Sequence, residues 1–274
     1  MARELASQIR KRLPRQKVKL MKTAHAGHGE ELAYTVARSE KNSLVISASG
    51  DGGYNDVING AMKALQEGWT VTTGLLPAGN ANDHYHNLHQ DDLIEQIVST
   101  TTTKIDVLKL EGTVGGKSVT RYAHSYIGLG FTPLIGEELN KTSLNRFKET
   151  WIVARSLFTI KPVRLRIGPK ARYYESVVFS NVDRMSKYLQ ISQPSSVTDG
   201  KFEVTIFRRR NKFQLIMVLL KATIGKVEED HQVSEFSLST INKTPVQMDG
   251  EIITLDPRTD VRITIERQAL PCVV

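Results

Sequence analysis

The spacing of hydrophobic and polar positions changes along the chain near residue 104. Before that point, apolar residues recur every three to four positions in 2–13 and 29–39, which predicts two helices, and Pro14 ends the first. The run 43–49 is nearly continuously apolar and is followed by glycines. Such a run is typical of a strand that is buried on both faces of a parallel sheet.

The alternation of strand-like and helix-like runs continues to residue 99. Short strands are predicted at 18–23 and 70–77, and helices at 55–66 and 91–99. Alternating strands and helices are the pattern of a doubly wound α/β fold, in which helices cover a mostly parallel sheet. We therefore predict an α/β domain over residues 1–102.

Beyond this domain the chain is rich in short strand-like runs, and turns containing glycine separate several of them. We predict strands at 104–110, 121–130, 163–168, 173–181, 202–207, 236–240, 246–255 and 261–266, turns at 115–116, 199–200 and 249–250, and helices near 134–157 and 212–222. The second domain, 103–256, is therefore mostly β. Residues 257–274 are expected to form a C-terminal strand and tail that return to the first domain.

The charge adds a basic surplus to this picture. The chain has 37 Lys and Arg residues against 29 Asp and Glu, a net charge of +8, and two basic clusters lie at 10–22 and 207–212. A solvated basic face and contact with an anionic membrane surface both fit these clusters. The interleaving of arginine with aromatic residues that favours nucleic acid is absent, so no nucleic-acid partner is expected.

Three features bear on the location of the protein. No apolar run reaches the length of a membrane span, since the longest, 213–225, is interrupted by Lys221. The N-terminal residues lack the apolar stretch of a secretory signal. Cys272 is the only cysteine, so no internal disulfide can form. We expect a cytoplasmic protein with peripheral membrane contact.

The glycines after the run 43–49 form the stretch Gly50-Asp51-Gly52-Gly53. Glycines between a parallel strand and a helix let backbone N–H groups approach an anion such as a phosphate. Asp51 would repel a phosphate unless a metal ion such as Mg²⁺ lies between the two. A simple strand-to-helix turn with Asp51 as the N-cap is the alternative interpretation.

Two later stretches favour the phosphate interpretation. Residues 74–85 again follow a strand and again contain glycine and an Asn-Asp pair. Loops at the ends of neighbouring parallel strands face one crevice. Residues 248–252 place Glu251 directly after an Asp-Gly turn, which is also compatible with an ordinary surface turn.

In their order along the chain, these stretches resemble the diacylglycerol kinase catalytic domain family, which includes sphingosine kinases and bacterial diacylglycerol kinases. The family pattern Gly-Gly-Asp-Gly-Thr-x-Asn-Glu-x-x-x-Gly is similar to residues 49–60, Pro-x-Gly-Thr-x-Asn-Asp to 77–83, and the much later Asp-Gly-Glu to 249–251. The surroundings of Asp106 and Asp199 also look like family positions. The resemblance implies an ATP-binding α/β domain followed by a β-sandwich domain that takes the lipid substrate.

The resemblance also implies roles for individual residues. Catalytic roles fall to Asp51 and to Glu251, the latter as general base for the lipid hydroxyl or as its orienter. The implied cofactor-binding residues are Gly50, Gly52, Gly53, Asn55, Gly79, Asn80, Asn82 and Thr23, and the implied metal-binding residues are Asp51, Asp83, Asp106 and Asp199. The implied reaction transfers the γ-phosphoryl group of ATP, with Mg²⁺, to a hydroxyl of a diacylglycerol-like lipid.

The chain departs from the family pattern at several positions. Gly53 and Asn80 stand where the family has threonine, and Ser49 stands where it has its first glycine. The chain opens in what resembles the family's first helix, so we expect a sheet without the family's first strand and Asn-Pro-x-Ser-Gly loop. The resulting open strand edge invites association, with a homodimer as one outcome. ATP binding is then expected to be weaker than about 1 mM.

Two alternatives use the same residues. One is a non-catalytic or weakly active lipid- or nucleotide-binding relative with a regulatory role, which the two replaced threonines favour. Retention of Asp51, Asp83 and Glu251 argues against it. The other is a kinase of a soluble substrate, of the NAD kinase type, which shares the Gly-Asp-Gly loop but gains no support from the later Asp-Gly-Glu.

Overall fold

The computed structural model describes residues 1–79, 82–88, 93–99, 101–130, 162–182, 184–185, 189–190, 196–208 and 230–273. The helices predicted near 134–157 and 212–222 lie outside the described residues, as does most of the basic cluster 207–212. The chain divides into two compact units. Met1–Asp106 and Arg267–Val274 form the first unit, and Val107–Glu266 form the second.

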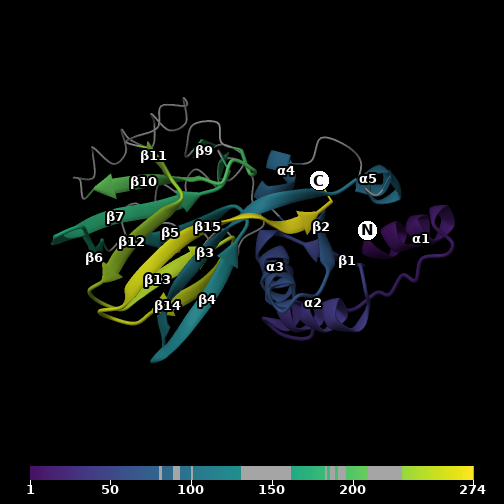
Figure 1. Cartoon of the computed structure of the whole chain (residues 1–274), viewed down its shortest axis with the longest axis horizontal. Helices are drawn as coiled ribbons and strands as arrows, with labels where there is room; N and C mark the ends of the chain where they lie inside the picture. Colours follow the sequence, from purple (N-terminus) through teal and green to yellow (C-terminus); the bar gives the residue numbers. More distant parts are fainter. Residues whose placement is uncertain are drawn as a thin grey trace. The chain divides into compact units, whose positions relative to one another are not determined.

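The first unit combines helices with a short parallel sheet (Figure 1). Its elements are α1 (Ala2–Arg12), α2 (His28–Ser39), β1 (Ser43–Ser49), α3 (Asp51–Gln66), β2 (Val71–Pro77), α4 (Asp83–Leu88) and α5 (Leu93–Ser99). β1 and β2 pair in parallel along their whole length, and the end of β15 (Asp260–Cys272) pairs in parallel with β2 on its other side. The predicted strand 43–49 and helix 29–39 are confirmed to within one residue.

Two local predictions are wrong. Residues 18–23 form no strand but an irregular, largely exposed segment, because alternation alone does not supply a neighbouring strand for the backbone hydrogen bonds. The run 43–49 was also predicted to be buried on both faces, but β1 is only half-buried, and Leu44 is 38% exposed. Within the described residues β1 pairs with β2 alone and so stands at the edge of the sheet, which leaves one side of the strand uncovered.

Helices α2 and α3 pack closely at two glycines. A β-carbon at Gly60 would lie 2.2 Å from the carbonyl oxygen of Glu30, and one at Gly29 would lie 2.9 Å from the β-carbon of Asp56. Neither distance leaves room for a side chain, so glycine is required at both positions. This contact fixes α3, whose first turn carries the candidate site, against the rest of the unit.

The end of β15 completes the core of the first unit. Cys272 stands opposite Thr73 of β2, and the N–H of Val273 donates to the Thr73 carbonyl at 2.9 Å. The fully buried Tyr54 of α3 places its hydroxyl 2.9 Å from Thr73 Oγ1. Burial raises the pKa of Tyr54 well above its ordinary value and raises the pKa of the Cys272 thiol to about 12. α3, β2 and β15 therefore meet at one buried point.

The second unit is built from strands in its described part (Figure 1). They are β3 (Thr103–Val114), β4 (Lys117–Ala123), β5 (Tyr126–Gly130), β6 (Val163–Ile167), β7 (Lys170–Ser180), β8 (Arg184–Met185), β9 (Leu189–Gln190), β10 (Phe202–Arg208), β11 (Asp230–Val233), β12 (Glu235–Thr240), β13 (Thr244–Met248), β14 (Glu251–Leu255) and most of β15. β3 and β15 both run from one unit into the other. The hydrophobic core of this unit contains the buried rings of Phe179 and Phe202, and Leu129 and Leu165 belong to the same cluster.

Antiparallel hairpins form the frame of this unit. Gly115-Gly116 joins β3 to β4, and Asp249-Gly250 joins β13 to β14, as predicted. Asp199-Gly200 also lies in a turn, as predicted; it leads into β10, which pairs antiparallel with β7. Throughout the described chain, none of the helices combines the length and the apolar character needed to cross a bilayer.

Candidate functional site

The ends of β1 and β2 meet at two glycines. The N–H of Ala78 donates to the Ser49 carbonyl at 2.9 Å, which extends the β1–β2 ladder by one bond. A β-carbon at Gly79 would lie 2.4 Å from the Gly50 α-carbon, and one at Gly50 would lie 3.0 Å from the Gly79 α-carbon. The two loops therefore touch backbone to backbone. A side chain at either position would push them apart.

The loop after β2 is closed by an asparagine. Asn82 accepts a hydrogen bond from the Gly79 N–H at 2.9 Å through Oδ1 and donates one to the Gly79 carbonyl at 2.8 Å through Nδ2. Its φ of 52° is left-handed, which asparagine tolerates better than most residues. Asn80 lies outside the described residues, and nothing is described of the Asp83 side chain at the start of α4.

Helix α3 begins at Asp51, four residues before the predicted start, and Gly50 is its N-cap. The first bond within the helix runs from the Tyr54 N–H to the Gly50 carbonyl at 3.1 Å. The N–H groups of Asp51, Gly52 and Gly53 precede that bond and lie at the positive end of the helix dipole. The glycine-rich stretch is thus the first helical turn rather than a loop before it, and it is suited to an anion.

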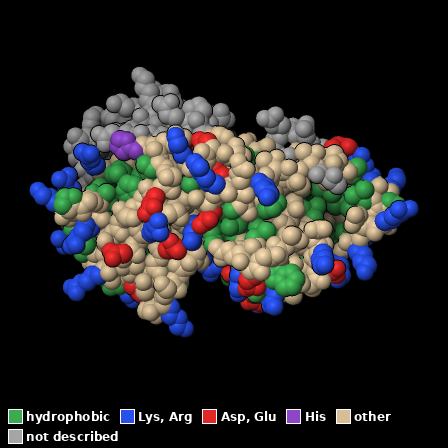
Figure 2. Space-filling model, in the orientation of Figure 1, with side chains coloured by type: hydrophobic (Ala, Val, Ile, Leu, Met, Phe, Trp, Pro, Cys, Tyr) green, Lys and Arg blue, Asp and Glu red, His purple; other side chains and the backbone are tan. Residues whose placement is uncertain are grey.

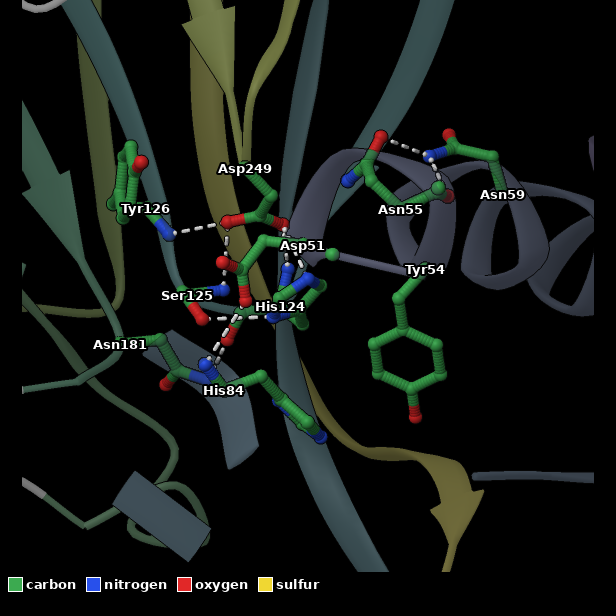
Figure 3. Close-up of polar contacts among 12 residues, drawn as sticks. Asp51, Tyr54, Asn55, Asn59, His84, His124, Ser125, Tyr126, Asn181 and Asp249 are labelled. Carbon is green, nitrogen blue, oxygen red and sulfur yellow. Dashed lines mark hydrogen bonds and ion pairs between the residues drawn. The ribbon is translucent and has the colours of Figure 1, made fainter. Parts of the chain in front are cut away.

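The Asp51 carboxylate is positioned by α4. Its Oδ1 accepts a hydrogen bond from the backbone N–H of His84 at 3.2 Å (Figure 3). The His84 ring is buried and lies against Tyr54, with 4.9 Å between the ring centroids. Carboxylate oxygens are ligands that Mg²⁺ prefers. The half-buried Asp51 therefore offers carboxylate oxygens to a metal ion at the N-terminal end of α3, the end that is suited to an anion.

A pair of serines from β1 supports the first turn of α3. Ser47 Oγ lies 2.7 Å from Ser49 Oγ and donates to the Gly53 carbonyl at 3.3 Å, while Ser49 Oγ donates to the Gly50 carbonyl at 2.9 Å. A β-carbon at Gly53 would lie 2.7 Å from both the Cβ and the Oγ of Ser49. The space that a threonine would occupy at position 53 is therefore filled by Ser49, which the sequence alone did not indicate.

Asn55 is buried in α3 one turn beyond Asp51. The side-chain Nδ2 of Asn59 donates to the backbone carbonyl of Asn55 at 2.9 Å and to the side-chain Oδ1 of Asn55 at 3.1 Å (Figure 3). Both side chains are at least 95% buried. Asn59 therefore orients the Asn55 amide, a role that follows from the helical spacing of four residues.

Two predicted metal ligands have structural partners. Asp106 of β3 is fully buried, and its Oδ1 accepts a hydrogen bond from the Gln268 N–H at 2.6 Å, which ties β3 to β15 within the first unit. Asp199 of the second unit is exposed and accepts bonds from the Lys201 N–H at 2.9 Å and from Gln232 Nε2 at 3.1 Å. These contacts stabilise a strand junction and a turn.

In the second unit, Glu251 begins β14 and is exposed. The preceding Asp249 is fully buried at a φ of 48°, and its carboxylate accepts three backbone N–H bonds: from His124 at 2.6 Å, Ser125 at 3.1 Å and Tyr126 at 2.9 Å (Figure 3). His124 Nε2 also lies 3.3 Å from Asp249 Oδ2. Asp249 thus fixes the hairpin that carries Glu251.

The irregular segment before α2 contains Thr23, which is exposed. Nearby, His25, His28 and Glu31 form the group of three potential metal ligands found in the described part of the chain, with ligand atoms within 4.8 Å of one another. His28 Nδ1 accepts the Ala24 N–H at 2.9 Å, so the proton of the neutral ring lies on Nε2. That tautomer leaves His28 without a lone pair for a metal ion.

Comparisons with known proteins repeatedly find similarity to diacylglycerol kinases. Residues 1–110 match the family model described as the diacylglycerol kinase catalytic domain. The diacylglycerol kinase of Bacillus subtilis (strain 168) is 21% identical over 248 residues, which cover 84% of this chain and 77% of that protein. The diacylglycerol kinase of Staphylococcus haemolyticus (strain JCSC1435) is 23% identical over 229 residues, or 76% of this chain and 64% of that protein.

Solved structures show the same fold. A diacylglycerol kinase from Bacillus anthracis str. Sterne superposes with a TM-score of 0.66 at 15% identity, over 99% of this chain and 91% of that chain. Yeast NADH kinase superposes with a TM-score of 0.52 at 11% identity, over 100% of this chain and 78% of that chain. The resemblance predicted from the glycine and Asn-Asp motifs is thereby confirmed: residues 1–110 match the diacylglycerol kinase catalytic domain family.

Proposed function

We propose that this protein is an ATP- and Mg²⁺-dependent lipid kinase that phosphorylates a hydroxyl of a diacylglycerol-like lipid. The contact between Gly50 and Gly79 carries the proposal, because it joins two strand-end loops next to the Asp51 carboxylate at a helix N-terminus. The family match over residues 1–110 and the relatives named as diacylglycerol kinases support a kinase.

The first unit has the groups for binding a nucleotide. The N–H groups of Asp51, Gly52 and Gly53 would donate to phosphate oxygens, and the Gly50–Gly79 contact lets the backbone approach them. Asn82 would keep the second loop in register through its two bonds to Gly79. Asp51 would hold Mg²⁺, whose positive charge would offset the repulsion between the carboxylate and the phosphates.

The second unit contributes the candidate base. In the transfer, the lipid hydroxyl oxygen bonds to the γ-phosphorus while the bond from that phosphorus to the β–γ bridging oxygen breaks, and ADP leaves. The hydroxyl proton passes to a carboxylate, for which Glu251 is our candidate. Asp249 acts through Glu251 as a positioning residue, because it anchors the hairpin on which Glu251 lies.

Transfer of radiolabelled phosphate from ATP to a panel of lipids tests the proposal. We expect Mg²⁺-dependent labelling of a diacylglycerol-like lipid and a loss of at least about a hundredfold in Asp51→Asn. Asp260→Asn makes the same chemical change at an exposed carboxylate bonded to Ser239 and should keep full activity. Near-normal transfer by Asp51→Asn would remove the metal role. Labelling of NAD in place of any lipid would favour the soluble-substrate alternative.

A second candidate function is a nucleotide- or lipid-binding relative with little turnover. The absence of a side chain hydroxyl at Gly53, with its space filled by Ser49, favours it. Calorimetric titration with a non-hydrolysable ATP analogue separates the two functions. Binding of the analogue without phosphate transfer to any lipid would support the second candidate.

A lipid substrate requires contact with a membrane, and residues 15–22 are a candidate surface for it in the first unit. Leu20 and Met21 are 52% and 51% exposed, and the flanking cations Lys17 and Lys22 are exposed as well. Apolar side chains framed by lysines are suited to the interface of an anionic bilayer. Leu20→Ser should weaken binding to anionic vesicles; unchanged binding would exclude this segment.

A further inference from the structure

Residues 49 and 53 depart from the family pattern in opposite directions. Ser49 stands where the pattern has its first glycine, and Gly53 stands where it has threonine. A β-carbon at Gly53 would lie 2.7 Å from both the Cβ and the Oγ of Ser49, so side chains at the two positions would occupy the same space. In this chain the hydroxyl in that space therefore comes from the end of β1 and not from the first turn of α3.

The Ser49 hydroxyl lies next to the proposed phosphate site. Ser49 directly precedes Gly50, the N-cap of α3, and its Oγ lies beside Gly53, the last of the three residues whose N–H groups come before the first helical bond. Ser49 is half-buried, whereas Ser47, two residues earlier on β1, is only 8% exposed. The Ser49 hydroxyl is thus a donor at the carboxyl end of the strand, where an anion bound to α3 would lie.

The two loops at this site carry no cation of their own. Neither residues 46–53 nor residues 74–79 contain Lys or Arg. Figure 2 shows the described Lys and Arg side chains scattered over the visible face, with Asp and Glu between them, rather than gathered in one patch. Binding of a phosphate by these loops therefore depends on neutral donors, namely backbone N–H groups and any hydroxyl within reach.

The bonds that Ser49 makes allow its hydroxyl to turn toward a ligand. Its Oγ donates to the Gly50 carbonyl at 2.9 Å, and the same carbonyl accepts the Tyr54 N–H at 3.1 Å. The Gly50 carbonyl therefore keeps a partner when the Ser49 proton points elsewhere, and no acceptor is left unpaired. The change costs little, because only the hydroxyl proton has to rotate.

Ser47 strengthens the Ser49 hydroxyl as a donor. The two Oγ atoms are 2.7 Å apart, and either hydroxyl can donate to the other. When Ser49 donates to an anion, Ser47 can donate to Ser49 Oγ, and each bond in such a chain polarises the next. The two serines are therefore arranged to donate in series, from Ser47 to Ser49 and from Ser49 to a ligand.

We propose that the Ser49 hydroxyl donates to a phosphate oxygen of a bound nucleoside triphosphate, as the hydroxyl donor that Gly53 cannot provide. The inference rests on the proposed function, because that function brings a nucleotide to the N-terminal end of α3. The competing explanation is that Ser49 only ties β1 to α3 through the Gly50 carbonyl. The two explanations differ in whether loss of the hydroxyl weakens the binding of phosphate specifically.

Three variants of the full chain test the proposal. Ser49→Ala removes the hydroxyl and keeps the β-carbon. The exchange variant, Ser49→Gly with Gly53→Ser, returns a hydroxyl to the same space from α3. Ser39→Ala is the matched control: it also removes a serine hydroxyl that donates to a backbone carbonyl in the first unit, that of Val36 at 3.2 Å, but at the exposed end of α2. Amide chemical-shift titration measures binding of a non-hydrolysable ATP analogue with Mg²⁺, and adenosine is the probe without phosphate.

A hydrogen bond to a charged group changes affinity by about tenfold or more. We therefore expect Ser49→Ala to bind the analogue about tenfold more weakly than wild type and to bind adenosine equally well. The exchange variant should recover to within about threefold of wild type, and Ser39→Ala should be unchanged. Unchanged affinity for the analogue in Ser49→Ala would overturn the proposal. Equal losses for the analogue and adenosine, or a folded exchange variant that recovers nothing, would overturn it as well.

A kinase assay separates this inference from the proposed function. In phosphate transfer to diacylglycerol, Ser49→Ala should raise the KM for ATP about tenfold and leave the KM for the lipid unchanged. If wild type binds the analogue through Ser49 but phosphorylates no lipid, the proposed function fails and the phosphate contact remains. If wild type phosphorylates a lipid and Ser49→Ala keeps the wild-type KM for ATP, the phosphate contact fails and the proposed function remains.

Discussion

Replacement of Gly53 by alanine tests how β1 and α3 pack at the candidate site. Gly53 lies in the first turn of α3 and is exposed, a position at which Gly→Ala ordinarily stabilises a helix by about 0.5–1 kcal/mol. Here the added β-carbon would lie 2.7 Å from both the Cβ and the Oγ of Ser49. Ordinary carbon–carbon contacts are about 3.5–4.0 Å, so the overlap approaches 1 Å.

The two Ser49 atoms differ in how they can respond. The hydroxyl can rotate away from the new methyl group, but the β-carbon is fixed by the backbone of β1, which pairs with Pro77 at this residue. Overpacking of this kind costs about 1–3 kcal/mol. We therefore expect Gly53→Ala to lower the free energy of unfolding by about 1–2 kcal/mol. In a Ser49→Gly background, where the obstacle is gone, it should raise that free energy by about 0.5–1 kcal/mol.

Urea unfolding of the full chain at pH 7 measures this reversal of sign. The matched control is Ser49→Ala, which removes the hydroxyl and keeps the β-carbon, so Gly53→Ala should remain destabilising in that background. An equal effect of Gly53→Ala in all three backgrounds would refute the packing argument, as would a rescue by Ser49→Ala as large as that by Ser49→Gly. A rescue in Ser49→Gly alone would show that residues 49 and 53 can only change together.

Three further expectations follow from contacts described above. Gly79→Ala should lower the free energy of unfolding by about 3 kcal/mol and weaken binding of an ATP analogue, because the added β-carbon would lie 2.4 Å from the α-carbon of Gly50. Urea unfolding measures the first effect and calorimetry the second, and unchanged values would contradict the contact. Asp249→Asn keeps the shape of the side chain and tolerates the left-handed φ, but it removes the negative charge that accepts three backbone N–H bonds. Urea unfolding should show that the free energy of unfolding falls by about 2–4 kcal/mol. The control Asp199→Asn, at an exposed carboxylate, should lower it by less than about 0.5 kcal/mol. Burial raises the pKa of the Cys272 thiol to about 12, so roughly one molecule in ten thousand carries the thiolate at pH 8. Cys272 should therefore react with a disulfide reagent only when the protein unfolds, and reaction at the rate of free cysteine would contradict its burial.

Hydrophobic periodicity was sufficient to locate the elements that frame the site. The helix 28–39 and the strand 43–49 each have a strong local pattern, and the glycines at 50 and 79 mark the strand ends. The order of the short motifs was sufficient to indicate the family, which the match to residues 1–110 bears out. These features are encoded within a few neighbouring residues each.

Other features depend on residues that are distant in the chain and so could not be predicted. In the sequence, Asp249 looks like an ordinary turn residue, but its carboxylate binds the backbone of 124–126, which only the pairing of β5 with β13 brings near. Likewise, the burial of β1 depends on whether another strand covers its edge. The role of Ser49 depends on the distance between the end of β1 and the first turn of α3, and no sequence pattern specifies that distance.

The C-terminal strand has a consequence for the order in which this protein can fold. Residues 1–106 leave the ribosome before residues 267–273, yet their unit also needs the later segment, whose Leu270, Cys272 and Val273 are buried in it. The intervening 107–266 must therefore be synthesised before the first unit can complete its sheet beside β2. During that interval Thr73 and its neighbours expose an unpaired strand edge, a state that is prone to aggregation and that chaperones protect. A protein of this design completes the sheet beneath its candidate nucleotide-binding site only after residues 267–273 have been synthesised.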